Sequence, residues 1–259
     1  MGILCILGIE RTGSSRTATL LSGFEHLLVK EEIFHPNAAH TMDDEWRELG
    51  PYAGIADVTG IRDHRLVSWM RNHPNQALDW LVHRAKGRTV VLKLFPGHIE
   101  NRDELHRLFE RSDIAFLITR RRPIDCYISA LKAKRTGKWR NADTTTVKVE
   151  GNVGQFLGVL ARATDWYAYC RARIAAAGLP HIDLSYADEI AKPEGALLPI
   201  LVAKLRTLGI DPGRYSTAAR VAPLQRQDRN TDYASKMTNW SEFTAALRAR
   251  PEYFAAFLE

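Results

Sequence analysis

The sequence predicts an α/β fold in which a P-loop-like, mostly parallel sheet is flanked by helices. Three observations carry this prediction: short apolar runs alternate with amphipathic stretches, the first run has no polar face, and a glycine-containing loop follows it. Alternating strands and helices favour parallel strands joined by right-handed crossovers. No repeat or Pro/Gly-rich linker marks a boundary, so we expect a single domain over residues 1–259.

The first expected strand is the apolar run of residues 3–9, which suits a strand buried on both faces of a parallel sheet. The next stretch has apolar side chains at helical spacing, namely Leu20, Leu21, Phe24, Leu27 and Leu28. Further strands are expected at 89–95, 114–119 and 181–184. Further helices are expected at 76–85, 103–109, 123–134, 153–177 and 194–208.

Two polar segments interrupt this alternation. Residues 35–75 are expected to form an insertion after the first helix. Residues 135–152 carry four basic side chains and are either a lid over a ligand or an ordinary surface loop, because loops of this length often bind ligands.

The composition excludes several classes of protein. With 45% hydrophobic and 25% charged residues, the chain is typical of a soluble globular protein and not of a disordered, collagen-like or coiled-coil chain. Three widely spaced cysteines exclude a disulfide scaffold and favour a reducing compartment. No apolar run is long enough to cross a bilayer, and no signal peptide is recognisable, so a cytoplasmic protein without a transmembrane segment is expected.

The net charge of +6 fits a nucleic acid, an anionic membrane surface or one small polyanion as partner. Nucleic acid is disfavoured, because the aromatic residues do not interleave with basic ones as a stacking platform requires.

The first motif is a loop between the first strand and the first helix. Gly8 and Gly13 have the spacing of a phosphate-binding loop, but Ser14-Ser15 stands where a nucleoside triphosphate loop has lysine followed by serine or threonine. Backbone N–H groups at a helix N-terminus still form an anion site. Taken alone, the loop suits an ordinary helix cap equally well. Its side-chain donors are Arg11, Thr12, Ser14, Ser15 and Arg16.

The second motif follows the strand that ends near Thr119. Pro123 suits the first turn of a helix, so Arg121 at the strand end and Ser129 within the helix are placed to hold a phosphate together. The alternative is that Arg120–Arg122 form a solvated turn. Ligands of parallel sheets bind at the carboxyl ends of strands, which favours the phosphate site.

With both motifs in this order, the chain resembles the sulfotransferases that use 3′-phosphoadenosine 5′-phosphosulfate (PAPS) and release adenosine 3′,5′-bisphosphate (PAP). The resemblance implies that residues 11–16, Gly13 included, grip the 5′-phosphosulfate, and that Arg121 and Ser129 bind the 3′-phosphate. Segments 225–229 and 238–243 resemble the C-terminal loop and helix of bacterial carbohydrate sulfotransferases of the nodulation-factor and trehalose types. They imply nucleotide contacts by Gln227 and Arg229, and more weakly by Arg226.

The resemblance also implies a general base. Cytosolic family members have a catalytic histidine two residues after a lysine at the end of the strand expected here at 89–95. In this chain Phe95, not a histidine, lies two residues after Lys93. Carbohydrate-type members use a glutamate after the first helix, which implies Glu32, 32 − 11 = 21 residues beyond Arg11. Glu31, the adjacent residue in the sequence, is an alternative candidate for the general base, and His98 is a further candidate. Glu31 and Glu32 are expected at a helix C-terminus, where acidic side chains interact unfavourably with the helix dipole. This cost favours a functional role for the pair. Lys93 is implied to stabilise the leaving group.

The implied acceptor is a hydroxyl or amine of a glycan or glycolipid. Trp46, Tyr52, Trp69 and Trp139 are expected either to line a sugar-binding cleft or to pack in the core. No metal is expected, because the histidines and cysteines show no metal-ligand spacing. Two other functions are considered for this chain. One is a P-loop kinase-like phosphotransferase, whose loop lysine is missing from this sequence. The other is a non-catalytic module that binds anions or nucleic acid.

Overall fold

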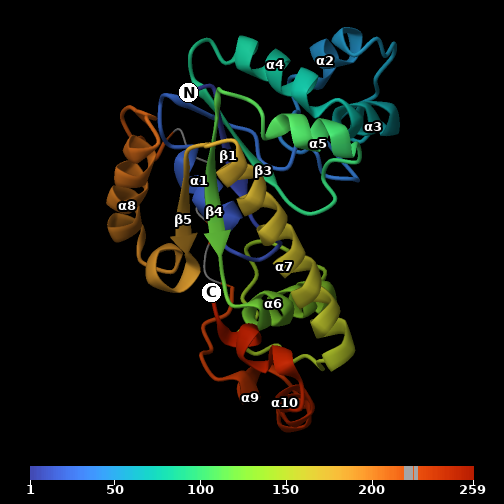
Figure 1. Cartoon of the computed structure of the whole chain (residues 1–259), viewed down its shortest axis with the longest axis vertical. Helices are drawn as coiled ribbons and strands as arrows, with labels where there is room; N and C mark the ends of the chain where they lie inside the picture. Colours follow the sequence, from blue (N-terminus) through green and yellow to red (C-terminus); the bar gives the residue numbers. More distant parts are fainter. Residues whose placement is uncertain (219–223, 225–226) are drawn as a thin grey trace.

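The described residues form a five-stranded sheet in which each strand is parallel to its neighbours, in the order β2-β3-β1-β4-β5 (Figure 1). The computed structural model describes residues 1–218, 224 and 227–259. The strands are β1 (Ile3–Leu7), β2 (Leu27–Val29), β3 (Thr89–Leu94), β4 (Ile114–Arg120) and β5 (His181–Ser185). The predicted α/β fold with a parallel sheet is confirmed.

Helices connect and flank these strands. They are α1 (Ser14–Leu21), α2 (Trp46–Tyr52), α3 (His64–Asn72), α4 (Pro74–Arg84), α5 (Arg102–Leu108), α6 (Pro123–Thr136), α7 (Val153–Ala176), α8 (Glu194–Thr207), α9 (Tyr233–Lys236) and α10 (Trp240–Arg248), with a π-helical turn η1 (Tyr186–Ile190) and a 3-10 helix η2 (Pro251–Phe257). The ends of α4 to α8 lie within two residues of the predicted ones. Among the described helices, none is both long and apolar enough to span a bilayer.

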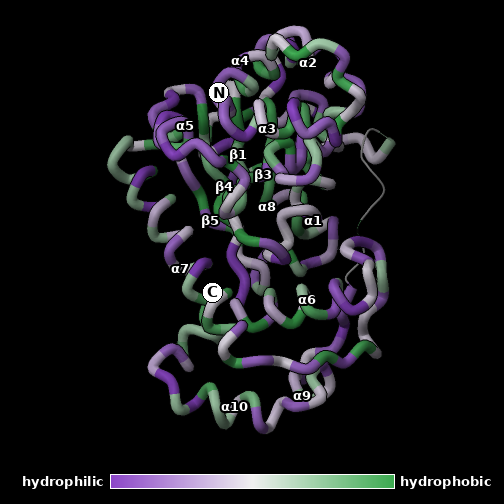
Figure 2. Tube along the Cα trace, turned by 90° about the vertical axis from the view of Figure 1, so that its right-hand side faces the viewer, coloured by the Kyte–Doolittle hydropathy of each residue, from purple (hydrophilic) through white to green (hydrophobic). Residues whose placement is uncertain are grey.

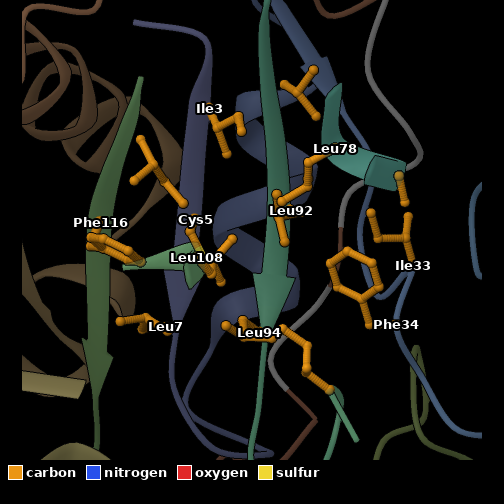
Figure 3. Packing of buried hydrophobic residues seen from close by; sticks show 14 of the residues in the cluster. Ile3, Cys5, Leu7, Ile33, Phe34, Leu78, Leu92, Leu94, Leu108 and Phe116 are labelled. Carbon is orange, nitrogen blue, oxygen red and sulfur yellow. The ribbon is translucent and has the colours of Figure 1, made fainter. Parts of the chain in front are cut away.

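β1 is the centre of the sheet, and all five of its residues are fully buried. Successive side chains of a strand point to opposite faces. Ile3, Cys5 and Leu7 pack in one cluster with buried residues of α3, α4, α5 and α7, and Figure 3 shows Leu78 of α4 and Leu108 of α5 in this cluster. Leu4 and Ile6 pack on the other face with buried residues of α1 and α8. The sheet is therefore covered by helices on both faces.

A third apolar cluster joins α6, the first half of α7, α10 and η2. At its centre, the ring of Phe156 lies 5.4 Å from that of Tyr127 and 5.8 Å from that of Phe243, measured between centroids. Figures 1 and 2 show α9 and α10 on the far side of α6 from the sheet. The C-terminal segment is thus anchored to the helix that follows β4.

The prediction of one helix that runs through Leu27 and Leu28 is wrong. α1 ends at Leu21, and the segment Leu27–Val29 is the edge strand β2, which pairs with β3. A three-residue apolar run is too short to distinguish the period of a strand from that of a helix. The segment is a strand because it pairs with β3, which is distant in the sequence.

Glu31 and Glu32 therefore follow a strand and do not end a helix, so the argument from the helix dipole does not apply to them. The backbone pairing continues past β2: Lys30 N donates to the carbonyl of Val91 over 2.6 Å, and Lys93 N donates to the carbonyl of Glu31 over 2.8 Å. These two bonds fix Glu31 beside Lys93.

The two polar segments have different structures. The segment 35–75 contains α2 and α3, and it contributes Leu49, Leu66 and Met70 to the cluster under β1. The segment 135–152 begins in the last turn of α6, which ends at Gly137 with φ +67°, and then runs without a helix or named strand to α7.

Gly13 is the N-cap of α1, with φ +91°, and it lies directly against η1. A Cβ built at this position would come within 2.8 Å of Ile190 Cγ2 and 2.9 Å of Tyr186 Cδ2. A side chain at Gly13 would therefore add a steric conflict to the strain of the left-handed backbone.

We expect Gly13→Ala to lower the free energy of unfolding by more than Gly178→Ala does. Gly178 has φ +62° and open space where a Cβ would lie, so its alanine variant carries only the backbone cost of about 1–2 kcal/mol. The contacts with η1 should add about 1–3 kcal/mol at Gly13. Urea unfolding of both variants measures the difference, and equal losses would show that η1 does not confine the loop.

Candidate functional site

A cavity of about 890 Å³ is lined by residues that follow the strands of the sheet. They are Arg11 after β1, Glu31 and Glu32 after β2, Phe95 after β3, Arg121 after β4 and Tyr186 after β5. This is the edge at which open parallel sheets bind ligands. Another cavity, of about 550 Å³, lies against α8 and is lined by none of the residues predicted to act.

Arg11 joins the two predicted motifs. Its backbone is left-handed, with φ +70°, which is uncommon for a residue other than glycine. Its guanidinium donates through Nε to Ser129 Oγ over 3.0 Å and through Nη1 to the carbonyl of Trp139 over 2.8 Å. Nη2 donates to the side-chain oxygen of Gln227. Arg11, Ser129 and Gln227, predicted from three separate segments, are therefore neighbours.

Arg121 lies against the same loop. Its Nη1 donates to the backbone carbonyl of Arg11 over 2.9 Å, and its guanidinium lies over the ring of Tyr186 at 4.0 Å. Burial, together with the nearby charge of Arg121, lowers the pKa of Arg11.

Two N–H groups beside these arginines are buried without an acceptor among the described residues: Nε of Arg121 and Nε2 of Gln227. Buried donors that lack an acceptor are costly. Together with the other N–H groups of the two guanidinium groups, these donors fit an anion with several oxygen acceptors.

The remaining residues of the first loop divide into two groups. Thr12 is fully buried, and its Oγ1 lies 2.9 Å from Thr119 Oγ1, so it ties the loop to β4 and does not line the cavity. The residues of this segment that line the cavity besides Arg11 are Glu10, Gly13, Ser14, Ser15 and Arg16. Arg16 also donates to a backbone carbonyl, that of Lys192, over 2.6 Å.

Lys93 connects the first loop to the carboxylates. Its side chain is fully buried, and Nζ lies 2.9 Å from Ser15 Oγ, 3.1 Å from Glu31 Oε2 and 2.7 Å from Glu32 Oε1. The ammonium thus lies at the contact between the first loop and the two acidic residues.

The two carboxylates have different surroundings. Glu31, whose side chain is 6% exposed, also forms an ion pair with Arg140. Glu32 is 20% exposed, and its Oε2 lies 4.0 Å from His98 Nε2. Burial alone would raise the pKa of Glu32, but the attraction and the hydrogen bond of Lys93 outweigh burial, so the pKa lies below its ordinary value.

Three histidines surround Glu32 on the side away from the first loop. The ring of His35 lies 4.9 Å from that of His40 and 6.0 Å from that of His98, between centroids. Burial lowers the pKa of His98 to about 4, so its imidazole is neutral near pH 7. Burial and the neighbouring His35 also lower the pKa of His40.

Sequence reasoning did not single out Arg140, which lines the cavity with Trp139 and Asn141. Its importance depends on a contact with Glu31, 109 residues away, which no local pattern shows. The sequence pointed only to the polar segment 135–152 as a whole, and Arg140 lies in that segment.

Lys132 was also missed. It is 1% exposed, and its Nζ lies 2.9 Å from the carbonyl of Thr144 and 2.7 Å from Asp228 Oδ2, so it holds the loop after α6 to the segment that carries Gln227. Its spacing of three residues from Ser129, which places both on one face of a helix, was the signal that could have found it.

Some predicted residues lie elsewhere. Arg229 is 70% exposed, pairs with Asp143 over 2.6 Å and does not line the cavity. Arg226 lies outside the described residues. Of the four aromatic residues considered for a sugar cleft, Trp139 lines the cavity, whereas Trp46, Tyr52 and Trp69 pack beside the core cluster or near it.

Within residues 1–218, 224 and 227–259, no group of three or more histidine, cysteine, aspartate or glutamate side chains is arranged to hold a metal ion.

The model of the sulfotransferase family matches residues 4–203, a segment that contains both motifs, Lys93 and the two glutamates. Among solved structures, the chain is similar to the sulfotransferase domain of the olefin synthase of Synechococcus PCC 7002, with 17% identity and a TM-score of 0.43 over 93% of this chain and 82% of that one. A search of curated proteins gave no match. Because the family model spans most of the chain, the protein belongs to the sulfotransferase family.

Proposed function

We propose that this sulfotransferase takes the sulfuryl group from PAPS and transfers it to a hydroxyl of a glycan or glycolipid. The observation that carries the proposal is the position of Lys93. One fully buried ammonium touches both Ser15 of the anion-binding loop and the carboxylate of Glu32, so donor-side and acceptor-side groups meet at one point.

The donor half of the cavity suits a nucleotide with separate phosphate groups. Arg11 and Arg121 supply two guanidinium groups, Ser129 supplies a hydroxyl, and Gln227 supplies an amide N–H; the Nε of Arg121 and the Nε2 of Gln227 lack an acceptor. In the assignment that the resemblance implies, the loop of Ser14 and Ser15 holds the 5′-phosphosulfate, and Arg121 and Ser129 hold the 3′-phosphate. The lysine that a nucleoside triphosphate loop needs is missing, which disfavours the kinase-like alternative.

The reaction requires removal of one proton and stabilisation of one leaving oxygen. When bound, PAPS supplies the sulfuryl group, whose bond to the phosphate oxygen breaks while the acceptor oxygen bonds to sulfur. Glu32 takes the acceptor proton. Lys93 donates a hydrogen bond to the leaving oxygen, and the proximity of Ser15 keeps the ammonium on the donor side.

Glu32 is a better candidate for the base than the two alternatives. Glu31 is paired with both Lys93 and Arg140, so its charge is balanced by two cations. His98 does not line the cavity, and its side chain is 5% exposed, so it is less accessible to an acceptor than Glu32. Glu32 faces the cavity and gives up only the contact with Lys93 when that ammonium turns to the leaving oxygen.

The acceptor half of the cavity is mostly polar. Apart from Ile61, Phe95 and Trp139, the lining beyond the glutamates consists of side chains that can donate or accept hydrogen bonds: His35, Asn37, His40, Thr41, Asp43, Arg140 and Asn141. Such a lining suits a polyhydroxylated acceptor, with the face of Trp139 available to a pyranose ring. An aryl or steroid acceptor would need a more apolar wall.

We expect Glu32→Gln to lower kcat by about 10²–10⁴-fold, because the amide cannot take the acceptor proton. Its affinity for PAP, measured by calorimetry, should stay that of the wild type. The matched control is Glu31→Gln, which should keep measurable turnover. A large loss in Glu31→Gln with near-normal rates in Glu32→Gln would reverse the assignment of the base.

We expect Arg121→Ala and Ser129→Ala to weaken PAP binding, the arginine variant by about 10- to 100-fold because it removes charge-assisted hydrogen bonds. Arg122→Ala is the control, since this adjacent arginine bonds Tyr233 and does not line the cavity. A thermal-shift series with PAP, ATP with Mg²⁺ and an oligonucleotide tests the ligand class in the same preparation. Stabilisation by ATP with Mg²⁺ but not by PAP would contradict the proposed donor.

A further inference from the structure

Arg140 reaches the carboxylate pair from the loop after α6. Its guanidinium forms an ion pair with Glu31 through Nη2 and Oε2, with a further contact of 3.4 Å between Nη1 and Oε1. The side chain of Glu31 is 6% exposed, whereas that of Arg140 is 47% exposed. The same loop is held at the preceding residue, where the carbonyl of Trp139 accepts a hydrogen bond from Arg11. The donor-side arginine therefore helps to place Arg140.

The charges of this cluster balance only when Arg140 is included. Lys93 faces two carboxylates but can neutralise one of them. The second negative charge would otherwise remain unpaired in a largely buried position, which is costly. Among the described residues, the ion-pair partners of Glu32 are Lys93 and His98, so Arg140 adds its charge to Glu31 and not to Glu32.

We propose that Arg140 is a positioning residue of the transfer reaction: it neutralises Glu31 and so leaves Lys93 available to Glu32 and to the leaving oxygen. This role rests on the proposed function. Without Arg140, Glu31 competes with Glu32 for the same ammonium, and its unbalanced charge lies beside the base. A carboxylate next to a like charge keeps its proton to higher pH.

Other charged and titratable groups face the same carboxylates. Lys93, His98, His35 and His40 surround Glu32, and Glu31 is its neighbour in the chain. None of the histidines is replaced in the variants compared below. Arg140 is one of the charges that lower the pKa of His40, so Arg140→Ala also raises that pKa, and Arg140→Lys, which keeps the charge, controls for this effect.

The test is a double-mutant cycle read as a pH profile. The acid limb of kcat/KM for the acceptor, at saturating PAPS, is measured for the wild type, Arg140→Ala, Glu31→Gln and the double variant. Arg140→Ala should shift the acid limb to higher pH by about 0.5–1 pH unit, and Glu31→Gln should shift it to lower pH. In the double variant the acid limb should lie close to its wild-type pH. Arg140→Lys, which keeps the charge, should stay near the wild type.

The control is Lys138→Ala, a basic residue of the same loop that does not line the cavity and should leave the limb in place. A limb that does not move in Arg140→Ala, or that stays displaced in the double variant, would overturn the role of Arg140. The double variant is decisive because it leaves no unpaired Glu31 and so tests the idea even if Arg140→Ala folds poorly. A wild type without PAPS-dependent turnover would instead contradict the proposed function, and this role with it.

Discussion

The buried ammonium of Lys93 is the contact on which the rest of the cavity depends. A fully buried lysine is stable only when its charge and its donors are matched, and here Ser15, Glu31 and Glu32 match them. Sheet topology makes this possible. β3 lies between β1 and β2, so the residues that follow its two neighbours arrive on either side of Lys93. A change in the register of either pairing would separate the anion-binding loop from the carboxylates.

Arg11 has a corresponding role for the loops. Its left-handed backbone aims the guanidinium across the cavity, where it meets α6 at Ser129, the following loop at Trp139 and the C-terminal segment at Gln227. Lys132 connects the loop after α6 to the C-terminal segment, because its Nζ donates to the carbonyl of Thr144 and to Asp228. The loop after α6 and the C-terminal segment are thus each contacted by two cations, Arg11 and Lys132, through hydrogen bonds.

Most of the parallel sheet could be predicted because its strands are continuous apolar runs and its long helices begin at recognisable residues, such as Pro123 of α6. β2 could not, because three apolar residues fit a helix as well as a strand, and only the pairing with β3 distinguishes them. Within the cavity, Arg11, Lys93, Arg121 and the two glutamates belong to local motifs. Arg140 and Lys132 do not, because the contacts that define their roles join residues 109 and 96 positions apart.

The partners of the cations indicate where an anion enters the cavity. In the part of the chain that the structure describes, Arg11 is bonded by neutral oxygen atoms only, those of Ser129, Trp139 and Gln227, and no carboxylate forms an ion pair with it. Lys93, by contrast, is already matched by carboxylates. Arg11 thus has no direct ion-pair partner there, although the charge of Glu10 acts on it, whereas Lys93 and Arg140 contact the two glutamates directly. A polyanion would therefore gain more by contacting Arg11 and Arg121 than by contacting Lys93, whose charge is already paired with carboxylates.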